Sequence, residues 1–100
     1  MQAFSSPNAP KPAGAYTPAL RVGDLVFVSG QGPAAPDGKV ISGTIEEETR
    51  LTLQNVKTLL EAAGARMDQV VKCGCFLADI EDFPRFNAVY REFFKEPLPC

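Results

Sequence analysis

Residues 44–64 read TIEEETRLTLQNVKTLLEAAG, and this stretch decides how the fold is layered. Thr44 and Glu47 are spaced as a helix capping box, and the acidic residues after Thr44 suit the positive end of a helix. Gly64 stands where a left-handed residue commonly ends a helix. At about 100° per residue, the apolar positions form one broad stripe. The pattern predicts an amphipathic helix over residues 45–63 that covers a sheet.

A β-hairpin is predicted on the N-terminal side of this helix. Residues 19–22 (ALRV) and 25–29 (LVFVS) are rich in β-branched and aromatic side chains, and the GD dipeptide between them is typical of a two-residue turn. The following GQGP ends the second strand. Residues 7–18 contain four prolines, which oppose both helix and sheet, so they predict a loop.

The sequence predicts a strand and then a second helix on the C-terminal side. Residues 70–77 (VVKCGCFL) have the composition of a strand in which alternate side chains face one way. Asp82 is positioned to cap a helix over residues 83–95, and Pro84 is tolerated in its first turn. The aromatic residues of that helix predict its buried face. Residues 1–100 together indicate a single α+β domain.

Composition excludes several classes of function. One hundred residues with 45% hydrophobic and 22% charged side chains indicate one soluble globular domain. A net charge of -2 and a pI near 5.0 offer no basic surface for nucleic acid, and no apolar run reaches the roughly 18 residues of a membrane span. The chain has no histidine, which excludes Ser-His-Asp and Cys-His catalysis and His-based zinc sites.

The three cysteines are informative about the cellular compartment and give little support to a metal site. Cys73, Cys75 and Cys100 are an odd number, and the chain does not begin like a signal peptide, so we expect a reducing, cytoplasmic setting. Only Cys100 is left as a third thiol for the Cys73 and Cys75 pair. We therefore interpret the pair as small core residues rather than metal ligands.

Three places carry candidate functional groups, and each has a structural alternative. Asn87 puts an amide on the apolar face of the second helix, where it needs either a loop backbone or a ligand as partner. Tyr16 lies in the proline-rich loop, where packing with a bonded hydroxyl is the alternative to substrate contact. Ser29, Gly30 and Gln31 end a strand, either as a simple tight turn or as backbone groups that hold a water or an oxyanion.

Several strings stand in a fixed order along the chain: GAY (14–16), VSGQGP (28–33), LQNV (53–56), EAAGA (61–65), VVK (70–72) and DFPRFNAVYREFF (82–94). Their order and spacing resemble the RidA family, also called YjgF/YER057c/UK114, over essentially the whole chain. The resemblance implies a chorismate-mutase-like α+β fold with a mixed β-sheet and two helices packed on one face. It implies a homotrimer with clefts between subunits, and it implies no metal or organic cofactor.

The resemblance also implies an activity and a set of site residues. Members of the well-studied branch hydrolyse reactive enamines and imines that carry a carboxylate, such as 2-aminoacrylate, to 2-oxo acids and ammonia. Tyr16 matches the tyrosine of the family's Gly-Pro-Tyr motif, Gly30 the residue whose backbone helps to place water, and Asn87 the cleft asparagine. These three are the implied catalytic residues, and Ser29 and Gln31 are the implied substrate-binding residues beside them.

This sequence departs from the family pattern at a few positions. Ala15 stands in place of the usual proline, and Glu48 stands where glutamine is common. Pro99 and Cys100 take the place of the family's Pro-Ala dipeptide, and the arginine that follows it in the family is absent. That arginine clamps the substrate carboxylate, a role suited to a bidentate guanidinium. We therefore expect a domain without its C-terminal strand or strands, and with little deaminase activity as it stands.

The main alternative function comes from the same resemblance. Some members of the family are described as endoribonucleases that inhibit translation, and others as chaperone-like or as non-catalytic proteins that bind small ligands. The pI near 5.0 opposes RNA binding, so we expect the deaminase chemistry rather than the nuclease.

Overall fold

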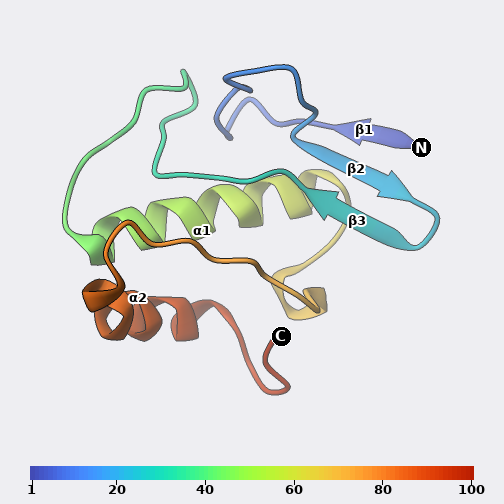
Figure 1. Ribbon diagram of the computed structural model, residues 1–100. Helices are drawn as coiled ribbons and strands as arrows, with labels where there is room; N and C mark the ends of the chain where they lie inside the picture. The colour runs from blue at the N-terminus through green and yellow to red at the C-terminus, as the bar shows by residue number, and fades with distance from the viewer.

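The computed structural model describes residues 1–100 as an antiparallel three-stranded sheet with two helices (Figure 1). The strand order is β1-β2-β3, helix α1 packs against β3, and helix α2 packs against α1. The predicted α+β class with two helices is therefore confirmed. The predicted mixed sheet is wrong, because both strand pairs are antiparallel, and α2 packs on α1 rather than on a face of the sheet. In chain order the elements are β1 (Gln2–Phe4), β2 (Ala19–Val22), β3 (Leu25–Val28), α1 (Ile45–Ala62) and α2 (Phe83–Tyr90), with short 3-10 turns at Met67–Gln69, Ile80–Asp82 and Arg91–Phe93.

The β2–β3 hairpin forms as the sequence predicts. Ala19 pairs with Val28 and Val22 pairs with Leu25 in an antiparallel register. Gly23 in the turn has a φ of 59°, a conformation that glycine adopts without the steric cost of a Cβ. The sequence pattern did not predict β1, a three-residue strand that pairs with the other edge of β2.

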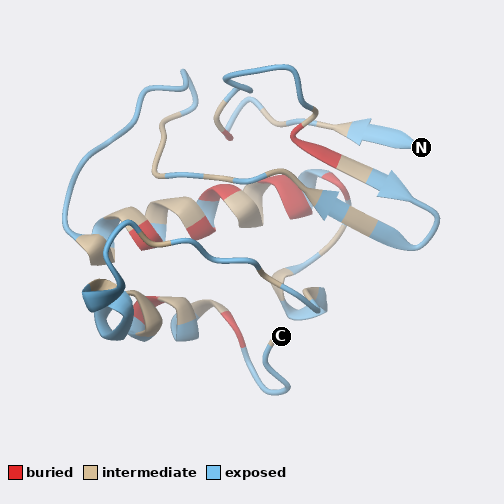
Figure 2. Ribbon diagram, in the orientation of Figure 1, coloured by how far each residue is buried: buried red, intermediate tan, exposed pale blue.

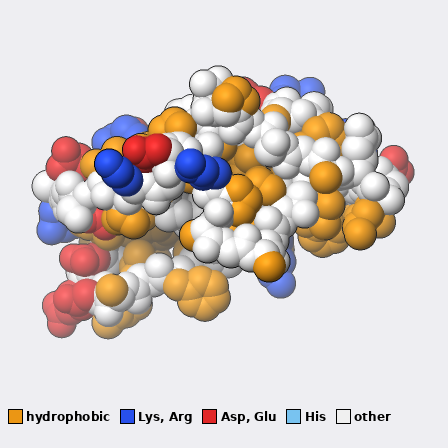
Figure 3. Space-filling model, turned by 90° about the horizontal axis from the view of Figure 1, so that it is seen from above, with side chains coloured by type: hydrophobic (Ala, Val, Ile, Leu, Met, Phe, Trp, Pro, Cys, Tyr) orange, Lys and Arg blue, Asp and Glu red, His pale blue; other side chains and the backbone are white.

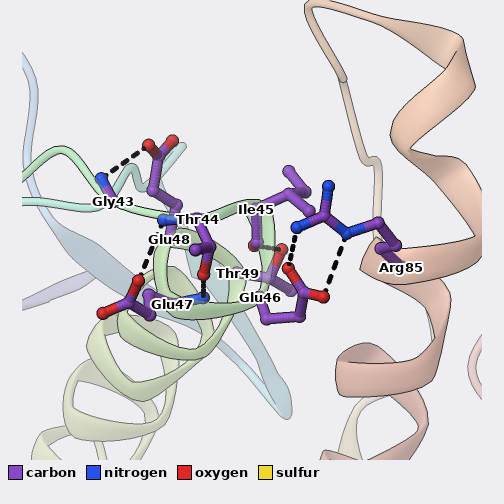
Figure 4. A network of polar contacts seen from close by, with 8 residues as sticks. All are labelled: Gly43, Thr44, Ile45, Glu46, Glu47, Glu48, Thr49 and Arg85. Atoms are coloured by element: carbon purple, nitrogen blue, oxygen red, sulfur yellow. Dashed lines mark hydrogen bonds and ion pairs between the residues drawn. The ribbon is translucent and has the colours of Figure 1, made fainter.

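Helix α1 begins and ends close to where its capping residues predict. The Thr44 hydroxyl accepts a hydrogen bond from the Glu47 backbone N–H at 3.1 Å, and the Glu47 carboxylate accepts one from the Thr44 N–H at 3.0 Å (Figure 4). The bond from the Thr44 backbone is the largest cause of a lowered pKa for Glu47. Gly64, just beyond the helix, has a φ of 81°. The predicted capping box is confirmed.

Helix α2 is shorter than predicted, and its predicted cap is wrong. It ends at Tyr90 and continues as a 3-10 turn instead of running to residue 95. Asp82 makes no capping hydrogen bond, because the chain is already turning there and Asp82 has helical rather than extended backbone angles. The cap belongs to the preceding 3-10 turn, where the Asp79 carboxylate accepts a hydrogen bond from the Glu81 backbone N–H at 2.9 Å.

An aromatic row and an ion pair connect α2 to its surroundings. Neighbouring rings stack along the helix, and the centroids of Tyr90 and Phe94 lie 4.8 Å apart. Arg85 on α2 binds Glu46 on α1 through two hydrogen bonds of 2.6 and 3.0 Å (Figure 4). The bonds from Arg85 are the largest cause of a lowered pKa for Glu46. The ion pair is exposed, so packing of the aromatic row contributes more stability than the pair does.

Residues 70–77 form no strand of the sheet, and this corrects the sequence prediction. The segment runs beside α1 without a neighbouring strand, and most of it is exposed (Figures 1 and 2). The Val70 N–H donates to the Met67 carbonyl at 3.2 Å in the preceding 3-10 turn. Beyond that, the backbone pairs only with Cys100, which accepts from the Cys73 N–H at 2.9 Å and donates to the Val71 carbonyl at 3.0 Å. A strand is stabilised by a ladder of such bonds, and one residue cannot provide it. The interpretation of Cys73 and Cys75 as core residues is also wrong, since Cys75 is exposed and Cys73 is half-buried.

The core is small and lies between the sheet and the second half of α1. Leu59 is fully buried against Ala9 and Ala19, and the half-buried Val28 packs beside them. Seen from above, most acidic side chains lie at the helical end, and hydrophobic side chains are spread in separate patches (Figure 3). Neither helix combines the length and the apolar character that crossing a membrane requires.

Candidate functional site

A groove of about 920 Å³ lies between β3 and residues 70–77. Its floor is one face of α1, with Leu53 and Val56 among the lining side chains, and α1 lies between the two walls in Figure 1. Val26 and Val28 line the wall formed by β3, and the opposite wall is the extended segment itself. The groove is therefore a slot with an apolar floor and a stretch of extended backbone on each side.

Both walls of the groove end in unpaired backbone edges. The Ser29 N–H donates to the Pro18 carbonyl on the β2 side, so the alternation of an extended chain turns the backbone groups of Val26 and Val28 away from β2. In the opposite wall, residues 71 and 73 bond to Cys100, and alternation turns the groups of residues 72, 74 and 76 the other way. Hydrogen-bonding capacity thus remains open on both sides of the slot.

The turn after β3 brings three predicted site residues together at the groove, namely Ser29, Gly30 and Gln31. The Ser29 hydroxyl donates to the Thr17 carbonyl at 2.5 Å, and the Gln31 side-chain amide donates to the Ser29 carbonyl at 3.1 Å. A Cβ placed on Gly30 would meet nothing within 4 Å, so the backbone of Gly30 is open to a small ligand. The arrangement offers fixed backbone donors and acceptors beside an apolar slot.

Asn55 supports this turn, and sequence reasoning missed it. Its side chain is 3% exposed, and its Nδ2 donates to the Gly32 carbonyl at 3.1 Å and to the Ala34 carbonyl at 2.9 Å. A signal was present in the sequence, because Asn55 lies three residues after Thr52 and four before Leu59 and so belongs to the buried side of the helix. A buried amide of this kind needs partners, and here the partners are the loop carbonyls.

Tyr16 and Asn87 lie outside the lining of the groove, although Tyr16 precedes Thr17, whose carbonyl accepts from the Ser29 hydroxyl. The Tyr16 ring is in the proline-rich loop, 46% exposed, and its hydroxyl accepts a hydrogen bond from the Ala13 backbone N–H at 3.1 Å. Asn87 is half-buried on α2, and its side chain makes no hydrogen bond within the chain. Neither residue lines the groove. One chain therefore brings three of the five predicted site residues together and leaves the other two elsewhere.

A phenol and two thiols line the groove away from the turn. Burial, together with contact with the Cys73 thiol, raises the pKa of Tyr90, and burial raises the pKa of Cys75. At neutral pH the phenol and the Cys75 thiol are therefore protonated, and neither is an activated nucleophile. No three Cys, Asp or Glu side chains gather closely enough to hold a metal ion.

The arginines that line the groove have structural partners. Arg21 donates through Nη2 to the Ala63 carbonyl at the end of α1, at 3.2 Å. Arg66 pairs with Asp68 at 3.0 Å. Lys72 is the basic side chain of the lining without an ion-pair partner. The groove as it stands thus offers no free guanidinium for a substrate carboxylate.

Comparison with known proteins identifies the family. The chain matches the family described as endoribonuclease L-PSP over residues 6–100. It is 45% identical over 94 residues to a RutC family protein of Pyrococcus abyssi, covering 93% of this chain and 74% of that protein. The chain belongs to the RidA (endoribonuclease L-PSP) family. It is also 41% identical over 98 residues to the 2-iminobutanoate/2-iminopropanoate deaminase of Dermatophagoides farinae, covering 97% of this chain and 77% of that protein.

Solved RidA-family structures share the fold described above. RidA from an Antarctic Psychrobacter species superimposes with a TM-score of 0.94 at 32% identity, over 100% of this chain and 81% of that chain. TdcF of E. coli, solved with bound serine, has a TM-score of 0.87 at 33% identity, over 93% of this chain and 73% of that chain. The predicted RidA-type α+β fold is confirmed by these neighbours. Each of them is longer than this chain.

Proposed function

We propose that this RidA-family chain serves the hydrolysis of reactive enamines and imines that carry a carboxylate, such as 2-aminoacrylate, to 2-oxo acids and ammonia. The observation that carries the proposal is the turn at residues 29–31, where the backbone of Gly30 is open beside the groove. A relative named as a deaminase of 2-imino acids supports the reaction type. TdcF with bound serine supports a small ligand with a carboxylate.

The reaction needs a placed water and proton transfers, and it passes no electrons to a cofactor. The enamine takes a proton at its terminal carbon and becomes an iminium ion. Water then adds to the iminium carbon, one water proton passes to the nitrogen, and the C–N bond breaks as ammonia leaves. The oxygen gives up its second proton, which replaces the one taken in the first step, and becomes the carbonyl of the 2-oxo acid. Fixed backbone dipoles stabilise the charge that develops in such steps without any histidine.

In this proposal each predicted site residue has a part in the reaction. The backbone of Gly30 holds the attacking water, and Ser29 and Gln31 flank the substrate. The hydroxyl of Tyr16 and the amide of Asn87 orient the substrate and exchange protons with it. No metal or organic cofactor takes part.

We further propose that the site is completed between subunits of a homotrimer. Tyr16 and Asn87 do not line the groove of their own chain, so a neighbouring subunit is needed to complete the set. The outward side chains of β3 support subunit contact, because Leu25 is 60% and Phe27 is 57% exposed. Light scattering on the purified protein tests the assembly. A monomer at micromolar concentration with an intact sheet contradicts it.

Substitution at the two separated residues tests the activity. Tyr16→Phe and Asn87→Ala are expected to lower the rate of 2-oxo acid release more than they lower Tm, because neither side chain holds the core together. Thr58→Ala, a change at a half-buried position of α1 outside the groove, is the matched control. If Asn87→Ala unfolds the protein and Asn87→Asp keeps nearly full activity, the amide of Asn87 is structural.

RNA cleavage is the second candidate, favoured by the family description endoribonuclease L-PSP. The net charge of -2 opposes it, because RNA binding relies on neutralising phosphates. We expect the protein to release 2-oxo acid from 2-aminoacrylate and to leave RNA intact under the same conditions. Cleaved RNA without 2-oxo acid release would show that the protein is a nuclease.

We also propose a cytoplasmic location. Cell fractionation tests this, since a relative in Schizosaccharomyces pombe is named as mitochondrial.

A further inference from the structure

We propose that Asn55 is a positioning residue for the reaction: its amide fixes the turn that presents the backbone of Gly30. The inference rests on the proposed function and extends it to a residue that does not touch the substrate. Both contacts come from one nitrogen, which donates to the carbonyls of Gly32 and Ala34, 23 and 21 residues away in sequence. Asn55 thereby ties the turn directly to the buried side of α1.

Ser29 ties the start of the turn to the chain before β2, because its hydroxyl and its N–H donate to the carbonyls of Thr17 and Pro18. No other side chain of α1 forms a hydrogen bond to the turn. A Cβ placed on Gly30 or on Gly32 would meet nothing within 4 Å, so these residues are not wedged by packing. Pro33 has no N–H to donate. The local backbone bonds, such as Ala34 N–H to the Gly32 carbonyl at 2.9 Å, close the loop on itself and do not attach it to the helix. The Asn55 amide is the attachment between this turn and α1.

Only a donor serves at this position. Two carbonyl oxygens converge on the Asn55 nitrogen, so an ionised carboxylate in its place would face two acceptors and repel both. A protonated carboxyl has one O–H and restores one of the two bonds. An alanine restores neither, but it adds no repulsion. A carboxylate, a protonated carboxyl and an alanine at position 55 therefore distinguish the effect of losing the hydrogen bonds from the effect of adding a charge.

Loss of the anchor is expected to act on the chemical step. Glycine has the widest choice of backbone conformations, so an unanchored turn lets Gly30 leave the orientation that holds the attacking water. Groups that place the water matter most in the transition state, whereas contacts that the substrate makes equally in both states set KM. The expected signature is a fall in kcat with little change in KM.

The experiment compares Asn55→Asp and Asn55→Ala with Gln54→Ala, an exposed neighbour whose side chain makes no hydrogen bond. We expect kcat to fall at least about 10-fold in both Asn55 variants, with KM within about 3-fold of wild type. Amide exchange at Ala34 and Ala35, whose N–H groups are hydrogen-bonded, is expected to speed up in both variants, and Gln54→Ala is expected to behave as wild type.

The pH profile adds a readout that a purely structural role would not move. Two facing carbonyls and burial raise the pKa of a carboxyl at position 55, so the Asn55→Asp variant regains a donor as the pH falls. Its kcat relative to wild type is expected to rise toward acidic pH. The Asn55→Ala variant is expected to show no such recovery.

The outcomes separate this inference from the proposed function. If wild type releases no 2-oxo acid, the proposed function fails, while faster exchange at Ala34 and Ala35 in the variants still supports the anchoring of the turn. Wild-type exchange and turnover in both variants would overturn the inference. Global unfolding of both variants would also overturn it, because Asn55 would then support the whole core rather than one turn.

Discussion

The β2–β3 hairpin and residues 70–77 have similar compositions and different structures. LVFV in β3 and VVKCGCFL in the later segment both combine β-branched, aromatic and small apolar residues. The hairpin strands lie four residues against four in a fixed register, whereas the backbone of the later segment bonds only to Met67 and Cys100. The turn at Gly23 brings the first pair together along the chain, and no neighbouring strand does so for the second.

The comparison teaches that β-propensity describes a segment's suitability for pairing, not its structure. Extended backbone is stable when its N–H and C=O groups have partners. In the hairpin, only the two-residue turn separates a strand from its partner in sequence. The later segment faces the open edge of β3 across the groove. Without a paired strand beside it, the segment leaves apolar side chains in contact with water, and Phe76 is 98% exposed.

The largest expected effect comes from giving the open edges a partner. We expect a chimera that continues beyond Cys100 with the last part of the Psychrobacter RidA to pair with the walls of the groove. The family pattern places a carboxylate-binding arginine in that part, so 2-oxo acid release is expected to rise by about 30-fold or more. Exchange of the amides of residues 72, 74 and 76 is expected to slow.

An extension of equal length made of Gly and Ser is the control for the chimera. It adds chain without strand-forming side chains or a guanidinium, and it is expected to leave rate and exchange unchanged. Equal rates for the chimera and this chain at equal folded concentration would show that the substrate clamp lies elsewhere.

The next largest effect contrasts a side chain beneath the hairpin with one in the unpaired segment. Leu59 is fully buried, so Leu59→Ala is expected to lower the free energy of unfolding by about 2 to 5 kcal/mol. Phe76→Ala removes a larger side chain that contacts mostly water, and it is expected to change stability by less than about 0.5 kcal/mol. Urea denaturation of both variants measures the difference. A Phe76→Ala loss as large as that of Leu59→Ala would show that the segment is packed in solution.

A smaller effect is expected from adding a Cβ to one glycine of each region. Gly23 has a positive φ and open space around it, so Gly23→Ala is expected to cost about 1 kcal/mol through backbone strain alone. Gly74 has no positive φ, and a Cβ there meets the Phe76 ring at an ordinary 3.9 Å. We expect Gly74→Ala to be nearly neutral in the same denaturation experiment. Equal losses at the two positions would mean that the turn conformation is not the cause.

The smallest effect concerns the exposed ion pair between Glu46 and Arg85. The pKa of Glu46 is below its ordinary value of 4.5, so the pair adds stability above that pH and loses it as the pH falls through the folded pKa. Glu46→Gln is expected to lower Tm slightly at neutral pH and to match wild type well below pH 4.5. A difference in Tm that persists at acidic pH would show that the charge of Glu46 is not the cause.

Local patterns were predictable because their determinants lie within a few residues of each other. The capping box at Thr44, the helix end at Gly64 and the GD turn each depend on contacts inside one short stretch. The clustering of Ser29, Gly30 and Gln31 followed for the same reason, since they are consecutive. Asn55 was missed because its partners lie more than twenty residues earlier in the chain.

The sequence by itself determined the hairpin, the first helix and the family of this chain, because turn residues, helix periodicity and motif spacing act locally. Only the tertiary structure decided that residues 70–77 form no strand of the sheet, that the amide of Asn55 is buried under the turn, and that Tyr16 and Asn87 lie outside the lining of the groove. Each of these depends on which distant segments meet. Strand pairing and the burial of polar groups require a partner that the local sequence cannot specify.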